Sequence, residues 1–226
     1  SEFTDSRDEN TYSYRLIGTQ VWMTENLAYL PRVDPSDLGS DLSPRYYVYN
    51  YNHENITTAK TYNEYIFYGV LYNWPAAMGG STSSSANPSG VQGACPDGWH
   101  LPSDAEWKQL EMYLGMTESD ANKTEDRGST VGGKLKATGT VTEGTGLWNG
   151  TNVGATNASN FSGLPGGFRL YSGGFAEIGN YGYWWSSTEG SSSTNAWRRY
   201  LCYTNGGVNR QIAANRQGFS VRCVRD

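Results

Sequence analysis

The sequence contains few of the residues on which catalytic and metal-binding sites depend. Its 226 residues include only two histidines, His53 and His100. The first lies in an irregular segment and the second in a turn before a predicted helix, so a zinc site or histidine acid–base catalysis has too few candidate residues. The sequence also contains no G-x-S-x-G, H-E-x-x-H or P-loop pattern. We therefore expect no enzyme activity, no metal and no cofactor.

The sequence also lacks a run of positive charge and a long apolar segment. Lys and Arg total 17 against 22 Asp and Glu, which gives a net charge of -5, and the basic residues are scattered. This distribution argues against binding to nucleic acid or to an anionic membrane. No apolar stretch is long enough to cross a bilayer. Residues 1–3 read as a vector remnant, so the expected leader of an exported chain would have preceded the natural sequence.

Glycine and aromatic residues, by contrast, are abundant. The chain contains 28 Gly, 17 Tyr and 8 Trp. The core must therefore come largely from aromatic clusters held between glycine-rich turns, which favours a loop-rich fold with β-strands. At this length one core is sufficient, and no Pro-rich or highly charged linker divides the chain. We predict one domain over residues 1–226, with a long irregular excursion at residues 31–66.

Three cysteines permit one disulfide and one free thiol. They are Cys95, Cys202 and Cys223. A composition rich in Tyr, Asn, Gly, Ser and Thr and poor in Lys favours an extracellular or cell-surface protein, and disulfides persist in that setting. The alternative is that all three cysteines are reduced, because cysteines without a spacing motif do not by themselves establish a disulfide.

The clearest local pattern is a helix that begins after residue 103. Ser103 and Glu106 have the spacing of a capping box, and Gly115 is placed to end the helix. Three large apolar residues fall on one helical face: Trp107, Leu110 and Leu114. A second short helix is predicted within residues 130–139. Alternating residues on either side of Gly18 predict a pair of strands with Trp22 buried, and the chain after Gly146 reads as successive strands and turns.

Other side chains could suggest binding chemistry, but simpler structural roles explain them. Asp104 with Glu106, or the acidic residues at 118, 120 and 126, could suggest calcium, yet helix capping and a solvated face account for them. Several aromatic residues could stack on sugars: Trp148, Tyr171, Tyr183, Trp184 and Trp185. Glycine-flanked tryptophans more often pack in a core, and we expect this for Trp184 and Trp107.

Seven separated motifs resemble one protein family in the same order. They are "IGTQVWMTENLAY", "GVLYNW", "CPDGWHLPSDAEW", "GGKLKATG", "FSGLPGGFR", "YWWSSTE" and "GFSVRCVRD". Across most of the chain they are similar to the Fibrobacter succinogenes major paralogous domain. The resemblance implies an α+β, C-type lectin-like fold that is loop-rich, with small antiparallel sheets and two helices. It also implies an exported protein of the Bacteroidetes or Fibrobacteres, a disulfide between Cys95 and Cys223, and distant similarity to formylglycine-generating enzymes.

The C-terminal segment "AWRRYLCYTNGGVNRQIAANRQGFSVRC" resembles a second class of sequence. It is similar to the variable region of proteins diversified by retroelements, in which a reverse transcriptase randomises the adenines of a template. The altered copy then encodes a lectin-fold binding surface. Randomised AAC codons can yield Tyr, Cys, Arg, Thr, Gly, Ile, Ala or Asn, and never Trp, Gln, Lys, Glu or Met. Alternating strand residues would separate this variable face from a fixed core face.

Eleven residues within about 197–217 fit the randomised set and form the predicted ligand-binding face. They are Arg198, Tyr200, Cys202, Thr204, Asn205, Gly207, Asn209, Ile212, Ala213, Ala214 and Asn215. The predicted fixed scaffold consists of Trp197, Arg199, Leu201, Tyr203, Val208, Arg210 and Arg216. We expect either a diversified display module that binds a protein or glycan on a cell or phage surface, or an adhesive glycan-binding domain of fixed specificity. An enzyme related to formylglycine-generating enzymes is a distant third alternative.

Overall fold

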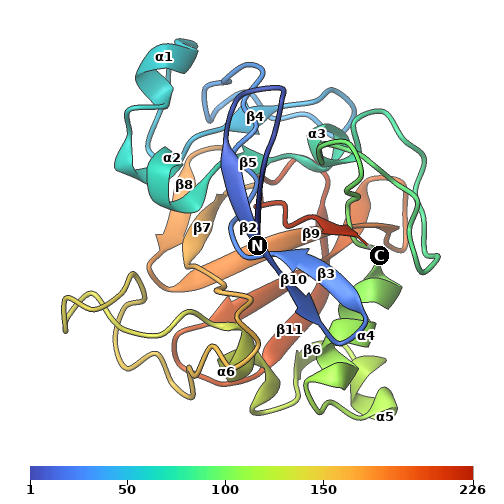
Figure 1. Cartoon of the computed structure of the whole chain (residues 1–226). Coiled ribbons are helices and arrows are strands. Elements are labelled where there is room, and N and C mark those ends of the chain that lie inside the picture. Colours follow the sequence, from blue (N-terminus) through green and yellow to red (C-terminus); the bar gives the residue numbers. More distant parts are fainter. Residues whose placement is uncertain (226) are drawn as a thin grey trace.

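Three sheets of short strands organise residues 1–225, which are the residues that this computed structural model describes (Figure 1). The largest sheet has six strands, in the order β6 (Glu125–Arg127), β11 (Val208–Ala214), β10 (Asn195–Cys202), β9 (Tyr181–Glu189), β7 (Gly166–Arg169) and β8 (Phe175–Ile178). A four-stranded sheet has the order β1 (Glu2–Thr4), β2 (Thr11–Ile17), β3 (Gln20–Met23) and β12 (Val224–Arg225). A third sheet pairs β4 (Tyr46–Tyr47) with β5 (Leu71–Tyr72).

Helices connect these strands and are mostly single turns. They are α1 (Ile56–Ala59), α2 (Asn63–Tyr68), α3 (Trp74–Met78), α4 (Asp104–Tyr113), α5 (Glu118–Ala121) and α6 (Val131–Leu135). In Figure 1 the helices α1 and α2 lie at the upper left, and α4 and α5 lie at the lower right. The α+β class is therefore confirmed.

Two details differ from the sequence-based expectation. The described residues contain six helices rather than two, because side-chain caps from Asn55, Asn73 and Thr117 stabilise single turns that are too short for periodicity to reveal. The large sheet is not wholly antiparallel, since β7 pairs with β9 in parallel through Gly167 and Gly182.

The segment 31–66 contains β4, α1 and the start of α2 between irregular stretches. Contacts with the rest of the protein hold it in place. The guanidinium of Arg169 on β7 donates a hydrogen bond to the carbonyl oxygen of Ser36, at 2.8 Å. The guanidinium of Arg216 donates to the carboxylate of Asp41, at 2.8 Å. The excursion is thus tied to strand β7 of the large sheet.

Helix α4 has the predicted start and buried face. The backbone N–H of Glu106 donates to the hydroxyl of Ser103, and the Glu106 carboxylate accepts from the backbone N–H of Ser103 at 2.8 Å, which completes the capping box. The predicted apolar face, Trp107, Leu110 and Leu114, is buried. Trp22 on β3 is also buried, and its ring lies 4.9 Å from that of Trp107. The predicted second helix is α6, and the predicted hairpin is β2 and β3.

The large sheet separates two hydrophobic clusters. Successive side chains of a strand point to opposite faces. On β9, Trp184 accordingly packs with Trp22 and Trp107 beneath α4, whereas Tyr183 and Trp185 pack in the other cluster. Aromatic rings therefore fill both sides of the sheet, as the composition predicts.

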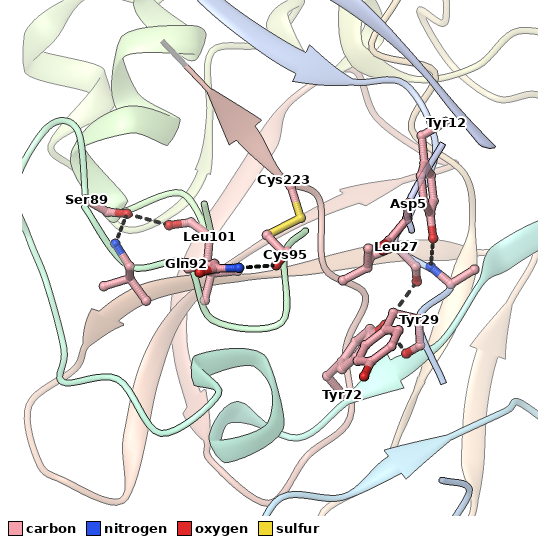
Figure 2. The surroundings of a disulfide bond; sticks show 12 residues. Asp5, Tyr12, Leu27, Tyr29, Tyr72, Ser89, Gln92, Cys95, Leu101 and Cys223 are labelled. Atoms are coloured by element: carbon pink, nitrogen blue, oxygen red, sulfur yellow. Dashed lines mark hydrogen bonds between the residues drawn. A yellow bond between two sulfur atoms is a disulfide. The ribbon is translucent and has the colours of Figure 1, made fainter. Parts of the chain in front are cut away.

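A disulfide joins Cys95 to Cys223, as the family resemblance implies (Figure 2). It connects the turn that precedes α4 to the residue before β12, and the two cysteines are 128 positions apart in the sequence. Cys202 is free and buried. The disulfide is consistent with an extracellular location. Within residues 1–225, the helices are all too short or too polar to span a bilayer.

Replacing both Cys95 and Cys223 by Ser should lower the free energy of unfolding by about 2–5 kcal/mol, because the bridge closes a long loop that restricts the unfolded chain. Urea denaturation without reductant measures the effect. The matched control is Cys202→Ser, which removes the free thiol and leaves the loop closed. Equal midpoints for the double variant and the control would show that the bridge contributes nothing to stability.

Candidate ligand-binding surfaces of the C-terminal sheet

The strand β10 alternates as the sequence predicts between residues 198 and 202. Leu201 belongs to the hydrophobic cluster beneath α4 that contains Trp22, Trp107 and Trp184, which we call the α4-side cluster, and Arg199 lies on the same face of the strand. Both are buried, with 1% of the surface of Arg199 and 2% of that of Leu201 exposed. Arg198 and Tyr200 are half-buried and contact the ring of Tyr183 on the opposite face. Each face of this strand therefore has its own surroundings.

On the α4 side, a buried ion network joins the helix to three strands. Asp104 pairs with Arg199 and Arg210 at 2.8 Å each, and Glu111 pairs with Arg199 at 2.6 Å and with Arg127 at 2.9 Å. Burial alone would raise the pKa of Asp104, but the two guanidiniums hold it well below its usual range. The network therefore fixes β6, β10 and β11 against α4.

Sequence reasoning missed this network. It assigned Asp104 to helix capping, whereas the capping side chain is that of Ser103 and Asp104 faces the arginines. The available signal was Arg199 on the core-facing phase of its strand, since a buried guanidinium requires a carboxylate partner. The sequence did not indicate which carboxylate would be that partner.

On the opposite side of the sheet lies a surface that we call the tyrosine face, composed of Tyr181, Tyr183, Arg198 and Tyr200. The Arg198 guanidinium carbon lies 5.1 Å from the ring centroid of Tyr183 and 4.9 Å from that of Tyr200. Its Nη2 donates to the side-chain oxygen of Gln211 at 2.9 Å. A hydrogen bond with Cys202, together with burial, raises the pKa of Tyr181 to about 12. These phenols therefore remain neutral at physiological pH and act as hydrogen-bonding groups.

The eleven predicted ligand residues do not form one exposed surface. Thr204 and Ile212 are exposed, and four others are half-buried: Arg198, Tyr200, Asn205 and Ala214. The remaining five are buried: Cys202, Gly207, Asn209, Ala213 and Asn215. The expectation that all eleven face solvent is therefore wrong for these five residues.

Neighbouring segments account for the burial. The edge strand β6 lies beside β11, and the side-chain amide of Asn209 donates to the carboxylate of Asp126 at 3.1 Å. The side chain of Asn215 donates to the carbonyl oxygen of Ser193, at 2.9 Å. Helix α6 packs so closely on residue 207 that a side chain at Gly132 would overlap its carbonyl oxygen. Strand alternation does not reveal such coverage.

Ile212 also lies on the other face from the one predicted. Its partner across the strands is Trp197, whereas Asn209 lies opposite Tyr200. Positions 209 and 212 differ by an odd number, so their side chains point to opposite faces of β11. Ile212 therefore belongs with Trp197 and Arg210 rather than with the tyrosine face.

Lys136 holds the turn that follows β10. Its ammonium donates hydrogen bonds to three carbonyl oxygens, those of Val153 at 2.8 Å and of Cys202 and Asn205 at 2.9 Å each. Burial lowers the pKa of Lys136 to about 8. The turn that carries Thr204 and Asn205 is thus fixed from below, which presents these two side chains in a defined position.

Two hollows flank the β6–β11 edge. One, of about 370 Å³, is lined by Asp126, Arg127, Gly128, Ser129, Asn205, Gly206 and Gly207. The other, of about 350 Å³, is lined by Thr124, Glu125, Ser191, Trp197, Gln211 and Ile212. We call the second one the tryptophan hollow. Three predicted ligand residues, Asn205, Gly207 and Ile212, line these hollows.

The remaining candidate groups have structural surroundings. The imidazole of His100 lies 2.6 Å from the Glu106 carboxylate, which also caps α4. No group of three His, Cys, Asp or Glu residues within 1–225 is arranged to hold a metal ion. Trp184 and Trp148 are buried, whereas Tyr171 is exposed beside Arg216.

Comparison with known proteins identifies one family. The family model of the Fibrobacter succinogenes major domain matches residues 16–225. No curated protein and no solved structure matches the chain. The family match spans α4, the disulfide and the whole six-stranded sheet. The chain therefore belongs to the Fibrobacter succinogenes major domain family.

Proposed function

We propose that this chain is an exported ligand-binding module with a C-type lectin-like fold, and that its ligand is a protein or glycan on a cell or phage surface. The residues available to a ligand are the accessible members of the predicted set, which lie on the tyrosine face and the turn after β10 or on the opposite face of β11: Arg198, Tyr200, Thr204 and Asn205 in the first group, and Ile212 and Ala214 in the second. This function involves no catalysis, metal or nucleic acid.

One observation carries this proposal. The groups that hold β10 and β11 in place are the buried arginines 199 and 210 and the buried Leu201, none of which belongs to the accessible set. Residues of the accessible set are exposed or half-buried, so substituting them should cost less stability than substituting the buried arginines or Leu201, because exposed positions contribute little to stability. Tyr and Arg in such positions are also the residue types that most often dominate binding interfaces.

Diversification by a retroelement is part of the proposal, and the gene locus tests it. A template copy beside a reverse-transcriptase gene should vary at codons for the accessible set. Codons for the buried residues, such as 209 and 215, should be constant, since random side chains there would collide with β6 or with the turn at Ser193. Absence of the template would leave a ligand-binding module of fixed specificity.

A fixed-specificity glycan-binding domain is the second candidate, and the tryptophan hollow favours it. Trp197 and Gln211 line this hollow, and neither residue can arise from a randomised AAC codon. A ligand contact that depends on them would be constant among copies. An adhesive domain that attaches to a polysaccharide has this property.

The triple variant Arg198→Ser, Tyr200→Thr and Thr204→Ala should lower the free energy of unfolding by less than about 2 kcal/mol. Surface substitutions cost about 0.5 kcal/mol each, and two of these three side chains are partly buried. Binding of the labelled protein to intact bacterial cells and immobilised glycans should be lost. The matched control is Leu201→Ala on the same strand, which should cost about 2–5 kcal/mol through a cavity. Unfolding of the triple variant would contradict the separation of fold from binding surface.

A further inference from the structure

The tryptophan hollow combines a fixed aromatic ring with exposed polar groups, and we propose that it binds one neutral pyranose unit of a glycan. This inference rests on the proposed function, because it names a ligand class for a surface that includes Ile212. It also adds residues that the proposed surface does not contain, namely Trp197 and the side chains around it.

The ring of Trp197 is held in position from behind. The guanidinium carbon of Arg210 lies 3.6 Å from the ring centroid. This guanidinium is itself fixed, since its Nε and Nη2 each donate to the Asp104 carboxylate at 2.8 Å. Because Arg210 covers one face of the indole, the opposite face and the ring edge are what the hollow presents to a ligand. A preorganised aromatic ring loses little entropy on binding.

The floor of the hollow is apolar. Trp197 and Ile212 are direct partners on neighbouring antiparallel strands, so their side chains lie together. Ile212 is 39% exposed. A pyranose whose hydroxyl groups are equatorial presents a face of C–H bonds, and such a face can pack on an indole and a branched aliphatic side chain.

The rim of the hollow is polar and faces solvent. Thr124, Glu125 and Ser191 are exposed, and their side chains make no hydrogen bond or ion pair to residues 1–225. The side chain of Gln211 lies on the tyrosine face, where its oxygen accepts from Arg198, so the rim groups that a ligand meets in the hollow are the two hydroxyls and the Glu125 carboxylate. The two Glu125 oxygens can accept from adjacent hydroxyl groups, and their charge disfavours an acidic sugar.

The walls are already formed. The turn between β9 and β10 is closed by a hydrogen bond from the backbone N–H of Gly190 to the carbonyl oxygen of Asn195, at 2.9 Å. Arg210 also donates to the carbonyl oxygens of Asn122 and Lys123, each at 3.4 Å, and so holds the segment that carries Thr124. A volume of about 350 Å³ is near the lower end of about 300–1,000 Å³ for small-molecule sites, which suits one sugar unit.

Electrophoresis of the native protein through gels that contain a soluble polysaccharide tests the inference. The neutral probes are hydroxyethyl cellulose, arabinoxylan and galactomannan, and the charged probe is polygalacturonate. At least one neutral gel should retard the wild-type protein. Trp197→Ala should weaken the affinity at least tenfold, and Glu125→Gln should weaken it several-fold. Tyr113→Ala removes an aromatic side chain that is 64% exposed on α4 and should change nothing.

Ile212→Asp serves as a second variant in case Trp197→Ala fails to fold, since it places a charge on the apolar floor at a partly exposed position. Thermal denaturation of each variant verifies folding. Equal retardation of the wild type and the folded variants would overturn the assignment of the site. Retardation by polygalacturonate alone, or by no gel, would overturn the ligand class.

The outcome for this site is separable from that for the proposed function. Binding to cells that is retained by Ile212→Asp and lost in the triple variant at 198, 200 and 204 would overturn this inference and leave the proposed function standing. Binding to cells could depend on Trp197 and yet disappear after the cells are treated with protease. That result would identify a peptide ligand and would also overturn the inference of a pyranose site.

Discussion

Replacing Asp104 by Asn is expected to lower the free energy of unfolding by about 3–5 kcal/mol, as removal of one partner from a buried ion pair does. The Asp104 carboxylate accepts three short hydrogen bonds from Arg199 and Arg210. Without it, only the carboxylate of Glu111 remains to balance three buried guanidiniums, those of Arg127, Arg199 and Arg210. Urea denaturation at neutral pH measures the loss.

The difference between the wild type and this variant should depend on pH. The folded-state pKa of Asp104 is depressed by the two arginines, so its stabilising effect is present above the unfolded-state pKa of about 3.9. The effect is lost progressively as the pH falls below that value towards the folded-state pKa. The two proteins should therefore converge in stability under strongly acidic conditions.

Asp120→Asn is the matched control for this prediction. Asp120 forms a single ion pair with Lys123 on the surface, at 2.6 Å, and both side chains are exposed. Exposed pairs contribute about 0–1 kcal/mol. A loss below about 1 kcal/mol for Asp104→Asn would show that the network is no more stabilising than a surface pair.

Replacing Trp107 by Ala should lower the free energy of unfolding by about 3–5 kcal/mol, because it leaves a cavity at the centre of the α4-side cluster. The Trp107 ring lies 4.9 Å from that of Trp22, 5.7 Å from that of Phe161 and 6.4 Å from that of Trp184, between centroids. The substitution also leaves the carbonyl oxygen of Trp185 without the indole N–H. Chemical denaturation monitored by circular dichroism measures the change.

The control for this substitution lies on the same helix. Tyr113→Ala removes an exposed ring and should change stability by about 0.5 kcal/mol or less. If the two variants have equal midpoints, the buried face of α4 has been assigned wrongly.

Local patterns in the sequence were sufficient for several elements. The capping box at Ser103 sets the start of α4, and the spacing of the apolar residues along this helix places Trp107 in the core. The hairpin around Gly18 follows from strand alternation and a glycine at a positive φ of 67°. The disulfide followed from the family motifs rather than from cysteine spacing. For the helix and the hairpin the determining interactions lie within a few residues, whereas the disulfide joins two separate family motifs.

Single-turn helices show where this local information ends. Helix α5 is capped by the side chain of Thr117 and contains only four residues, so it is too short to show a helical repeat of hydrophobic residues in the sequence. Helix α3 depends on Asn73, whose side chain also donates to the carbonyl oxygens of Ser40 and Ser43. Helix α3 therefore forms where a distant segment supplies partners for its capping residue, whereas α5 has only the local cap from Thr117 to the backbone N–H of Asp120.

The sequence by itself determined which side chains of β10 point the same way, because alternation is a property of the strand backbone. Only the tertiary structure decided which of them reach solvent. Asn209 is covered by β6, more than 80 residues earlier in the chain, with its partner Asp126 at a separation of 83. Arg199 finds Asp104 at a separation of 95. Burial and ion pairing at these positions depend on which distant segments pack there, and no period within the strand carries that information.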